Sequence, residues 1–175
     1  MDLVIRPSQP ADIAAITGIY ADAVVHGTAS FELEPPTEQE MARRRSALVD
    51  GGFPYLVAER GGALLGYAYA GPYRTRPAYR FTVEDSVYVA RSAQGAGVGR
   101  ALLSALVDAA EARRFRLMVA VIGDKASTGS IRLHEAVGFH HVGVLEPVGY
   151  KHRRWLASVL MQRVLGDGAA TPPGS

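Results

Sequence analysis

Glu84, in a run of residues beside a glycine-rich turn, and His134, in an apolar stretch later in the chain, are candidates for acid–base chemistry. A carboxylate can take the proton of an amine, and an imidazole can act as acid or base near neutral pH. Glutamate is mostly a surface residue, and a lone histidine in an apolar helix is often packed in a core, so a structural role is the alternative for each. Glu84 belongs to the run Thr82-Val83-Glu84-Asp85-Ser86-Val87-Tyr88-Val89, whose pattern predicts a strand.

A glycine-rich turn follows this strand. Its residues are Gln94, Gly95, Ala96, Gly97, Val98, Gly99 and Arg100. Glycine allows positive φ and brings backbone N–H groups close together, and the apolar spacing from Val98 onward predicts a helix whose N-terminus attracts anions. The spacing fits neither the dinucleotide fingerprint G-x-G-x-x-G nor the phosphate loop G-x-x-x-x-G-K-[ST]. A flexible connection without a ligand is the alternative.

The composition is that of one globular domain. We expect a single domain over 1–165 and a disordered tail over 166–175, which is rich in Gly, Ala and Pro. The net charge is +2, from 19 Lys and Arg against 17 Asp and Glu with the signs interspersed, which argues against nucleic acid as a partner. The absence of cysteine excludes disulfides, thiolate metal sites and an acyl-cysteine intermediate. No histidine or carboxylate spacing matches a metal motif, so we predict no metal.

No membrane or targeting segment is evident in the sequence. The N-terminal residues lack a charged leader followed by an apolar stretch, and no apolar run approaches the roughly 20 residues that span a bilayer. We therefore expect a cytoplasmic protein with no membrane partner.

Periodic patterns predict the elements that must position these residues. A capping box at Thr37 and Glu40 begins a polar helix, and a Gly-Gly turn joins two strands as a hairpin. The nearly continuous apolar run 115–122 predicts an interior strand. The predicted strands are 3–6, 54–59, 63–70, 81–89, 115–122, 140–145 and 155–164, and the predicted helices are 8–26, 37–49, one from 98 and 130–139.

The order β, α, α, β, β, β, α, β, α, β, β is similar to that of the GNAT fold. The segment Gln94-x-x-Gly97-x-Gly99 also resembles the Q/R-x-x-G-x-G/A loop of the GNAT superfamily of N-acetyltransferases. The resemblance implies an α/β (α+β) protein with a central mixed, mostly antiparallel twisted sheet of about seven strands and about four flanking helices. It also implies acetyl-coenzyme A as the co-substrate, with its pyrophosphate on the glycine turn.

Further segments resemble the phosphinothricin and methionine sulfoximine N-acetyltransferases within that superfamily. They are Thr28-x-x-Phe31-x-x-x-Pro35, Tyr67-Ala68-Tyr69-Ala70-Gly71-Pro72-Tyr73-Arg74, the strand 82–89, Val119-Ala120-Val121-Ile122, Leu133-His134-Glu135-Ala136-Val137-Gly138-Phe139 and Gly149-Tyr150-Lys151-His152-Arg153-Arg154-Trp155. The resemblance implies acetylation of the α-amino group of a small amino acid or analogue, of the phosphinothricin or methionine sulfoximine and sulfone type, by direct transfer in a ternary complex. Whether resistance to such a compound is the selected role is left open.

The same resemblance implies roles for the two titratable residues. Glu84 matches the family's carboxylate, which binds the amine or takes its proton. His134 stands where the wider superfamily commonly has a tyrosine that protonates the departing thiolate of coenzyme A. Which of the two is base and which is acid is left open.

Cofactor contacts are implied along the strand, the turn and the last helix. Backbone groups of Val87, Tyr88 and Val89 are expected to pair with the pantetheine arm as an added strand would, and residues 94–100 to hold the pyrophosphate. Ser127 and Ser130 are further expected contacts. Ser127 stands where the family usually has asparagine, after what resembles a one-residue insertion in 124–126, so this contact departs from the family pattern.

The expected acceptor site combines arginines, aromatic rings and the carboxylates of the strand. Guanidinium groups hold a carboxylate or phosphinate through two hydrogen bonds, whereas a solvated arginine loop is the alternative. The expected acceptor residues are Phe31 as part of a lid, Tyr73, Arg74, Arg80, Glu84, Asp85, Ser86 and Lys151. The resemblance also implies a homodimer in which Lys151 reaches the partner's site.

Two other functions remain open at this stage. The first is acetylation of another small amine, such as a polyamine or aminoglycoside, which Arg74, Arg76 and Arg80 disfavour because these acceptors are polycations. The second is a non-catalytic module that binds or senses acyl-coenzyme A. Such a module would keep the glycine turn but would not need Glu84 and His134.

Overall fold

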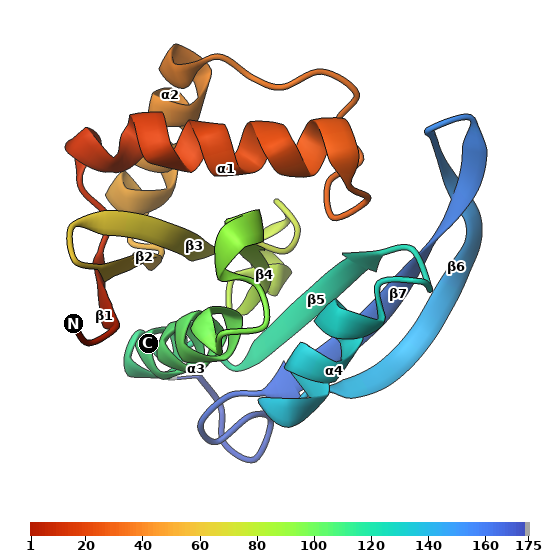
Figure 1. Ribbon diagram of the computed structural model, residues 1–175. Helices are drawn as coiled ribbons and strands as arrows, with labels where there is room; N and C mark the ends of the chain where they lie inside the picture. Colours follow the sequence, from red (N-terminus) through yellow and green to blue (C-terminus); the bar gives the residue numbers. More distant parts are fainter. Residues whose placement is uncertain (174–175) are drawn as a thin grey trace.

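The computed structural model describes residues 1–173, which contain seven strands and four α-helices. The strands are β1 (Val4–Pro7), β2 (Tyr55–Arg60), β3 (Ala63–Pro72), β4 (Thr82–Val89), β5 (Leu117–Gly123), β6 (His140–Lys151) and β7 (Arg154–Val164). The helices are α1 (Ile13–His26), α2 (Glu38–Asp50), α3 (Val98–Ala112) and α4 (Thr128–Ala136). The strands form one sheet in the order β1-β2-β3-β4-β5-β7-β6, as Figure 1 shows.

The sheet is mixed, with one parallel pair in its middle. All neighbouring strands are antiparallel except β4 and β5, which pair only over Thr82–Glu84 and Leu117–Val119. Beyond these residues β4 continues to Val89 and β5 to Gly123 without pairing to each other. The two central strands therefore part, and their facing backbone groups are available to another partner.

Helices cover both faces of the sheet. Figure 1 shows α1 and α2 on one side of β2, β3 and β4, with α3 on the other side. The stripe Leu102, Leu106 and Ala110 of α3 is fully buried against the sheet, as the four-residue spacing predicts. On the opposite face, α1 buries Ile16 against the tyrosines of β2 and β3, including Tyr67. Both faces of β4 are thus covered by helices.

Local signals confirm several of the predicted element ends. Thr37 accepts a hydrogen bond from the Glu40 N–H at the start of α2. Gly97 precedes α3 with φ +80°, and Gly138 follows α4 with φ +88°, conformations that favour glycine. The predicted fold class, a mixed and mostly antiparallel sheet with flanking helices, is confirmed.

The last two strands differ from their predicted bounds. The strand predicted over 140–145 continues to Lys151, and β7 begins at Arg154, so the two form one long hairpin. The register of their pairing shifts between Leu145 and Gly149. This irregularity, together with the exposure of nearly all of β6, removes the alternation on which a sequence prediction depends.

Residues 166–173 follow β7 as turns. The Gly168 N–H donates to the Leu165 carbonyl, and Arg116 donates to the Gly168 carbonyl. Disorder over 166–175 stays a prediction, and residues 174–175 lie outside the described part. Among the helices of residues 1–173, none is long and apolar enough to cross a membrane.

Candidate active site

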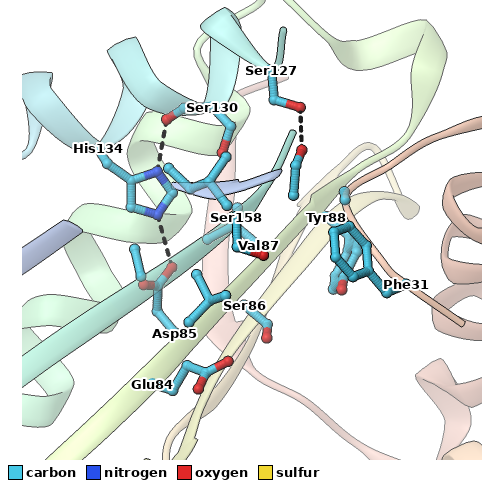
Figure 2. Close-up of a pocket in the computed structure, with 15 residues that line it drawn as sticks. Phe31, Glu84, Asp85, Ser86, Val87, Tyr88, Ser127, Ser130, His134 and Ser158 are labelled. Atoms are coloured by element: carbon cyan, nitrogen blue, oxygen red, sulfur yellow. Dashed lines mark hydrogen bonds and ion pairs between the residues drawn. The ribbon is translucent and has the colours of Figure 1, made fainter. Parts of the chain in front are cut away.

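A cavity of about 270 Å³ lies where β4 and β5 part. Its lining residues are Ala29, Phe31, Glu84, Asp85, Ser86, Val87, Tyr88, Ala120, Val121, Ile122, Gly123, Ser127, Ser130, His134 and Ser158, and Figure 2 labels the main ones. The side chains of β4 alternate between its two faces. Because the strands part here, residues from both faces of β4 reach one cavity.

Glu84 lies at the last position of β4 that pairs with β5. It is partly buried, and burial raises the pKa of its carboxyl above the ordinary value. The charge of Asp85 raises this pKa further, whereas the charge of Arg74 opposes the rise. A carboxylate of raised pKa holds a proton more strongly, so Glu84 is a better base than an exposed glutamate.

His134 and Asp85 form a buried pair beside Glu84. The His134 Nε2 lies 3.0 Å from Asp85 Oδ2, and their side chains are 5% and 2% exposed. The His134 Nδ1 lies 2.7 Å from the Ser130 carbonyl oxygen, one turn earlier in α4, as Figure 2 shows. Burial lowers the pKa of His134, but the hydrogen bond and charge of Asp85 outweigh it, so the pKa is raised. Both ring nitrogens therefore have protein partners.

A second cavity, of about 540 Å³, continues along β4 toward the glycine turn. Five of its lining residues are predicted cofactor contacts, namely Val87, Tyr88, Val89, Gln94 and Ser127. The others are Ile19, Asp22, Ala23, Gly27, Thr28, Ala29 and Arg91. The free backbone edge of β4 along this cavity suits the amides of a pantetheine arm, which can pair with it as a further strand.

The remaining predicted phosphate residues lie at the start of α3. Gly95 and Gly97 have φ values of +77° and +80°, which turn the chain into the helix. The first N–H groups of an α-helix lack intrahelical partners and carry its positive dipole end, so this terminus suits a pyrophosphate. Gly95, Ala96, Gly97, Val98, Gly99 and Arg100 do not line either cavity within the described chain, and the buried Val98 side chain anchors the helix instead.

Ser127, which replaces the family's asparagine, is engaged with its own chain. Its hydroxyl donates to the Gly123 carbonyl oxygen at 2.6 Å and lies 3.5 Å from the Thr28 hydroxyl oxygen. This arrangement joins the end of β5, the start of α4 and the loop after α1. Ser127 still lines both cavities, so it remains placed to meet a ligand.

The loop after α1 closes one side of the active-site cavity through Phe31. A Cβ atom on Gly149 would lie 2.5 Å from the Phe31 ring, and one on Gly123 would lie 2.9 Å from it. Glycine at both positions is thus what lets the ring pack between β5 and β6. The Lys151 Nζ donates to the Ser30 carbonyl oxygen at 2.6 Å, and burial lowers the pKa of this lysine. Lys151 therefore fastens the loop of its own chain and does not line the described cavity.

The predicted arginine and tyrosine patch lies outside the cavity. The Arg74 guanidinium lies 5.0 Å from the centre of the Tyr73 ring, and the Arg80 guanidinium lies 4.5 Å from that of Phe81. Tyr73, Arg74 and Arg80 do not line either cavity of residues 1–173, and both arginines are exposed. Their contact with the acceptor stays a prediction.

Sequence reasoning missed several lining residues, among them Ser158. It reaches the cavity because β7 pairs with β5 and places Ser158 opposite Gly123. Asp22 and Arg91 were also missed, and they form an ion pair at 3.1 Å between α1 and the segment after β4. Only the register and the packing of α1 reveal these positions. Within the described residues, no three His, Asp or Glu side chains lie close enough to hold a metal, and the absence of a metal stays a prediction.

In this chain two parallel central strands part beside a glycine turn, and a carboxyl group lies at the point of parting. The chain belongs to the acetyltransferase (GNAT) family, whose model matches residues 16–139. The predicted membership of this superfamily and the assignment as an N-acetyltransferase are confirmed.

The relatives include phosphinothricin and methionine sulfoximine acetyltransferases, which confirms the predicted resemblance. The chain is 53% identical over 169 residues to a phosphinothricin N-acetyltransferase of Alcaligenes faecalis, covering 97% of this chain and 86% of that protein. It is 42% identical over 172 residues to an L-methionine sulfoximine/L-methionine sulfone acetyltransferase of Salmonella typhimurium, covering 96% and 98%. A crystal structure of a phosphinothricin acetyltransferase from Sinorhizobium meliloti in complex with acetyl-coenzyme A matches with a TM-score of 0.97 and 48% identity, covering 100% of this chain and 95% of that one.

Proposed function

We propose that this protein transfers the acetyl group of acetyl-coenzyme A to the α-amino group of a small amino acid or analogue, such as phosphinothricin, methionine sulfoximine or methionine sulfone. The observation that carries the chemistry is Glu84, a carboxyl group of raised pKa at the point where β4 and β5 part. The substrate class is supported by relatives at 53% and 42% identity whose names specify these acceptors.

Glu84 acts as the base in this proposal. An α-amino group has a pKa of about 8, so it is mostly protonated at neutral pH and must lose a proton before it can attack. Glu84 accepts that proton, and the neutral amine then attacks the acetyl carbonyl while the thiolate of coenzyme A departs. The chain has no cysteine to carry an acyl group, which supports direct transfer in a ternary complex.

The co-substrate lies along the second cavity in this proposal. Acetyl-coenzyme A supplies the activated acetyl thioester. Backbone groups of Val87, Tyr88 and Val89 hold its pantetheine arm. Further contacts come from Ser127, which lines both cavities, and from Ser130, which lines the first. The N-terminus of α3 and the turn 94–97 hold the pyrophosphate.

Acceptor binding in this proposal involves Phe31, Asp85 and Ser86, which line the cavity with Glu84. In this proposal Tyr73, Arg74 and Arg80 attract an anionic side chain of the amine substrate. The proposal places the reaction in the cytoplasm. Acetylation of a toxic analogue there would give the cell resistance to it.

The assay that tests this function measures free thiol from acetyl-coenzyme A with several acceptors. The panel contains phosphinothricin, methionine sulfoximine, methionine sulfone, the common amino acids, spermidine and an aminoglycoside. We expect turnover with the amino-acid analogues. Turnover confined to the polycations would shift the substrate class, and tight cofactor binding without turnover of any amine would favour a sensing module.

We also propose a homodimer that forms through β6. This strand lies at the edge of the sheet, and its side exposes a group of large apolar side chains. They are Val142, Val144, Leu145, Val148, Tyr150 and, on β7, Trp155. Light scattering should give twice the chain mass for the wild type and the chain mass for Val144→Glu. Val49→Glu, at an exposed apolar position on α2, is the matched control that should stay dimeric. A monomeric wild type would end this proposal.

A further inference from the structure

The His134–Asp85 pair leaves no free nitrogen on the imidazole. One role left open for His134 is to give a proton directly to the departing thiolate, and such a donor needs an N–H that faces the ligand. Nδ1 faces the Ser130 carbonyl oxygen at 2.7 Å, and Nε2 faces Asp85 Oδ2 at 3.0 Å. Figure 2 shows both contacts. A direct role for His134 would require the breaking of one of these bonds in a buried site.

The two contacts determine how many protons the pair holds. A backbone carbonyl oxygen only accepts, so Nδ1 must carry a proton. Another proton must lie between Nε2 and Asp85 Oδ2, because two bare acceptors at 3.0 Å would repel each other. The pair is therefore an imidazolium and a carboxylate, or the equivalent neutral acid and imidazole. The raised pKa of His134 agrees with the imidazolium form.

The other carboxylate oxygen of Asp85 is the atom of the pair that has no protein partner in the described part of the chain. Asp85 Oδ1 is buried and has no hydrogen-bond partner among residues 1–173, while the Asp85 side chain is 2% exposed. Asp85 lines the cavity between β4 and β5. A buried acceptor without a partner is unfavourable in a native protein, so this oxygen points to a ligand that donates a hydrogen bond.

We propose that Asp85 Oδ1 accepts a hydrogen bond from the amino group of the amine substrate. In this proposal His134 is a positioning residue that holds Asp85 in place and balances its charge. This inference rests on the proposed function. It assigns His134 to the support of a substrate contact, in place of the acid or base role that the family resemblance implies.

The position of Glu84 indicates that the hydrogen-bond donor is the amino group of the amine substrate. Glu84 and Asp85 lie on opposite faces of β4, and both reach the same cavity. A substrate ammonium group carries three N–H donors and a positive charge, so it can satisfy both carboxylates together. Glu84 takes one proton from nitrogen, and a remaining N–H stays on Asp85 Oδ1. The proton between Nε2 and Oδ2 does not leave the pair.

Two near-isosteric substitutions test this inference by steady-state kinetics. Asp85→Asn can place its NH2 toward Nε2 and its oxygen toward the cavity, so it keeps the shape and removes the charge. His134→Gln keeps a donor toward Oδ2 but no positive charge. We expect the KM for the amine to rise about tenfold or more in each, with the KM for acetyl-coenzyme A changed less than about twofold. In the double variant the KM for the amine should exceed that of the more impaired single variant by no more than about threefold, because the two residues act as a unit.

A matched control exists on the surface. His141 Nε2 lies 3.3 Å from Glu135 Oε1, and both side chains are about half exposed. His141→Gln removes the same group from a histidine–carboxylate pair away from the cavity, so its kinetics should equal those of the wild type.

Nitrogen NMR of the His134 ring gives a readout that does not need turnover. In a pH titration, we expect the His134 ring of the wild type to stay protonated to a higher pH than the ring of Asp85→Asn, because Asp85 raises the pKa of His134. Loss of kcat in His134→Gln with an unchanged amine KM, or additive effects in the double variant, would identify His134 as a direct proton donor and overturn the inference. A raised KM for acetyl-coenzyme A alone would assign Asp85 Oδ1 to the cofactor and overturn the inference.

Absence of amine-dependent turnover in the wild type would overturn the proposed function and this inference together. The other outcomes leave the proposed function intact.

Discussion

Glu84 and Asp85 are neighbours in β4, yet their side chains reach one cavity from opposite faces of the sheet. Adjacent residues of a strand normally serve separate surfaces. Here the parting of β4 from β5 after Glu84 opens the sheet itself, so both carboxyl groups can meet the same ligand. The pKa of Glu84 is raised by its burial and then by the charge of Asp85, which couples the two groups.

Glu84→Gln tests the base and has a defined pH dependence. Its activity should fall about a hundredfold, the usual scale for a lost general base. The base works only when its carboxyl group is ionised, and the pKa of Glu84 is raised. Wild-type kcat/KM should therefore fall as the pH drops through a pKa higher than that of a free glutamate. The variant should lack this acidic limb in a pH–rate profile. An unchanged profile would assign the limb to another group.

The same substitution should stabilise the fold at neutral pH. A carboxyl group whose folded pKa is raised binds a proton more readily in the folded state, so its contribution to stability falls as pH rises through the raised pKa. Gln removes the buried charge and keeps the shape. Thermal unfolding at about pH 8 should therefore show a higher Tm for Glu84→Gln than for the wild type. A lower Tm would indicate that the charged form has a stabilising partner.

Gly149→Ala should disturb the wall that Phe31 builds. The new Cβ atom would lie 2.5 Å from the Phe31 ring, so the ring and its loop must move. We expect a loss of about 1–3 kcal/mol in the free energy of unfolding and a higher KM for the amine. Gly143→Ala in the same strand is the matched control, because nothing lies within 4 Å of its Cβ position. Equal effects of the two variants would rule out the Phe31 contact as the cause.

Gly97→Ala should weaken the binding of acetyl-coenzyme A. Gly97 precedes α3 with φ +80°, where alanine costs about 1–2 kcal/mol of backbone strain. We expect lower stability and a KM for acetyl-coenzyme A raised about tenfold, with the amine KM little changed. Gly18→Ala inside α1 is the control, since its Cβ meets nothing within 4 Å and it should stabilise by about 0.5–1 kcal/mol. An unaltered cofactor KM would show that this turn does not hold the pyrophosphate.

Lys151→Met should loosen the loop after α1. Met keeps much of the buried stem but cannot donate to the Ser30 carbonyl oxygen. We expect a loss of about 1–2 kcal/mol in the free energy of unfolding. The KM for the amine should also rise, by the same factor at low and at high protein concentration. If Lys151 instead serves the partner's site, a mixed dimer of Lys151→Met and Glu84→Gln chains would contain one site with both Glu84 and Lys151. Mixing the two variants would then restore activity. Denaturant unfolding and such mixing experiments separate the two roles.

The amino-acid sequence by itself determined most of the local structure. The four-residue apolar spacing on α3, the glycines before it and the capping residues of α2 are local signals, and the structure confirms the elements they predict. The motif residues also sufficed to identify the family, because their order along the chain is specific. The bounds of β6 were not predictable beyond Leu145, since an exposed and irregular edge strand carries no alternating pattern.

The tertiary structure decided how the site residues meet. Asp85 and His134 are separated by 49 positions, and their bond depends on where α4 lies against the parted strands. Ser158 lines the cavity only because β7 inserts between β5 and β6 in the sheet. The sequence shows which residues can exchange protons, but distances and burial determine that both ring nitrogens of His134 have partners and that Asp85 Oδ1 has none within residues 1–173. Those quantities arise from packing between distant segments, and no local pattern encodes them.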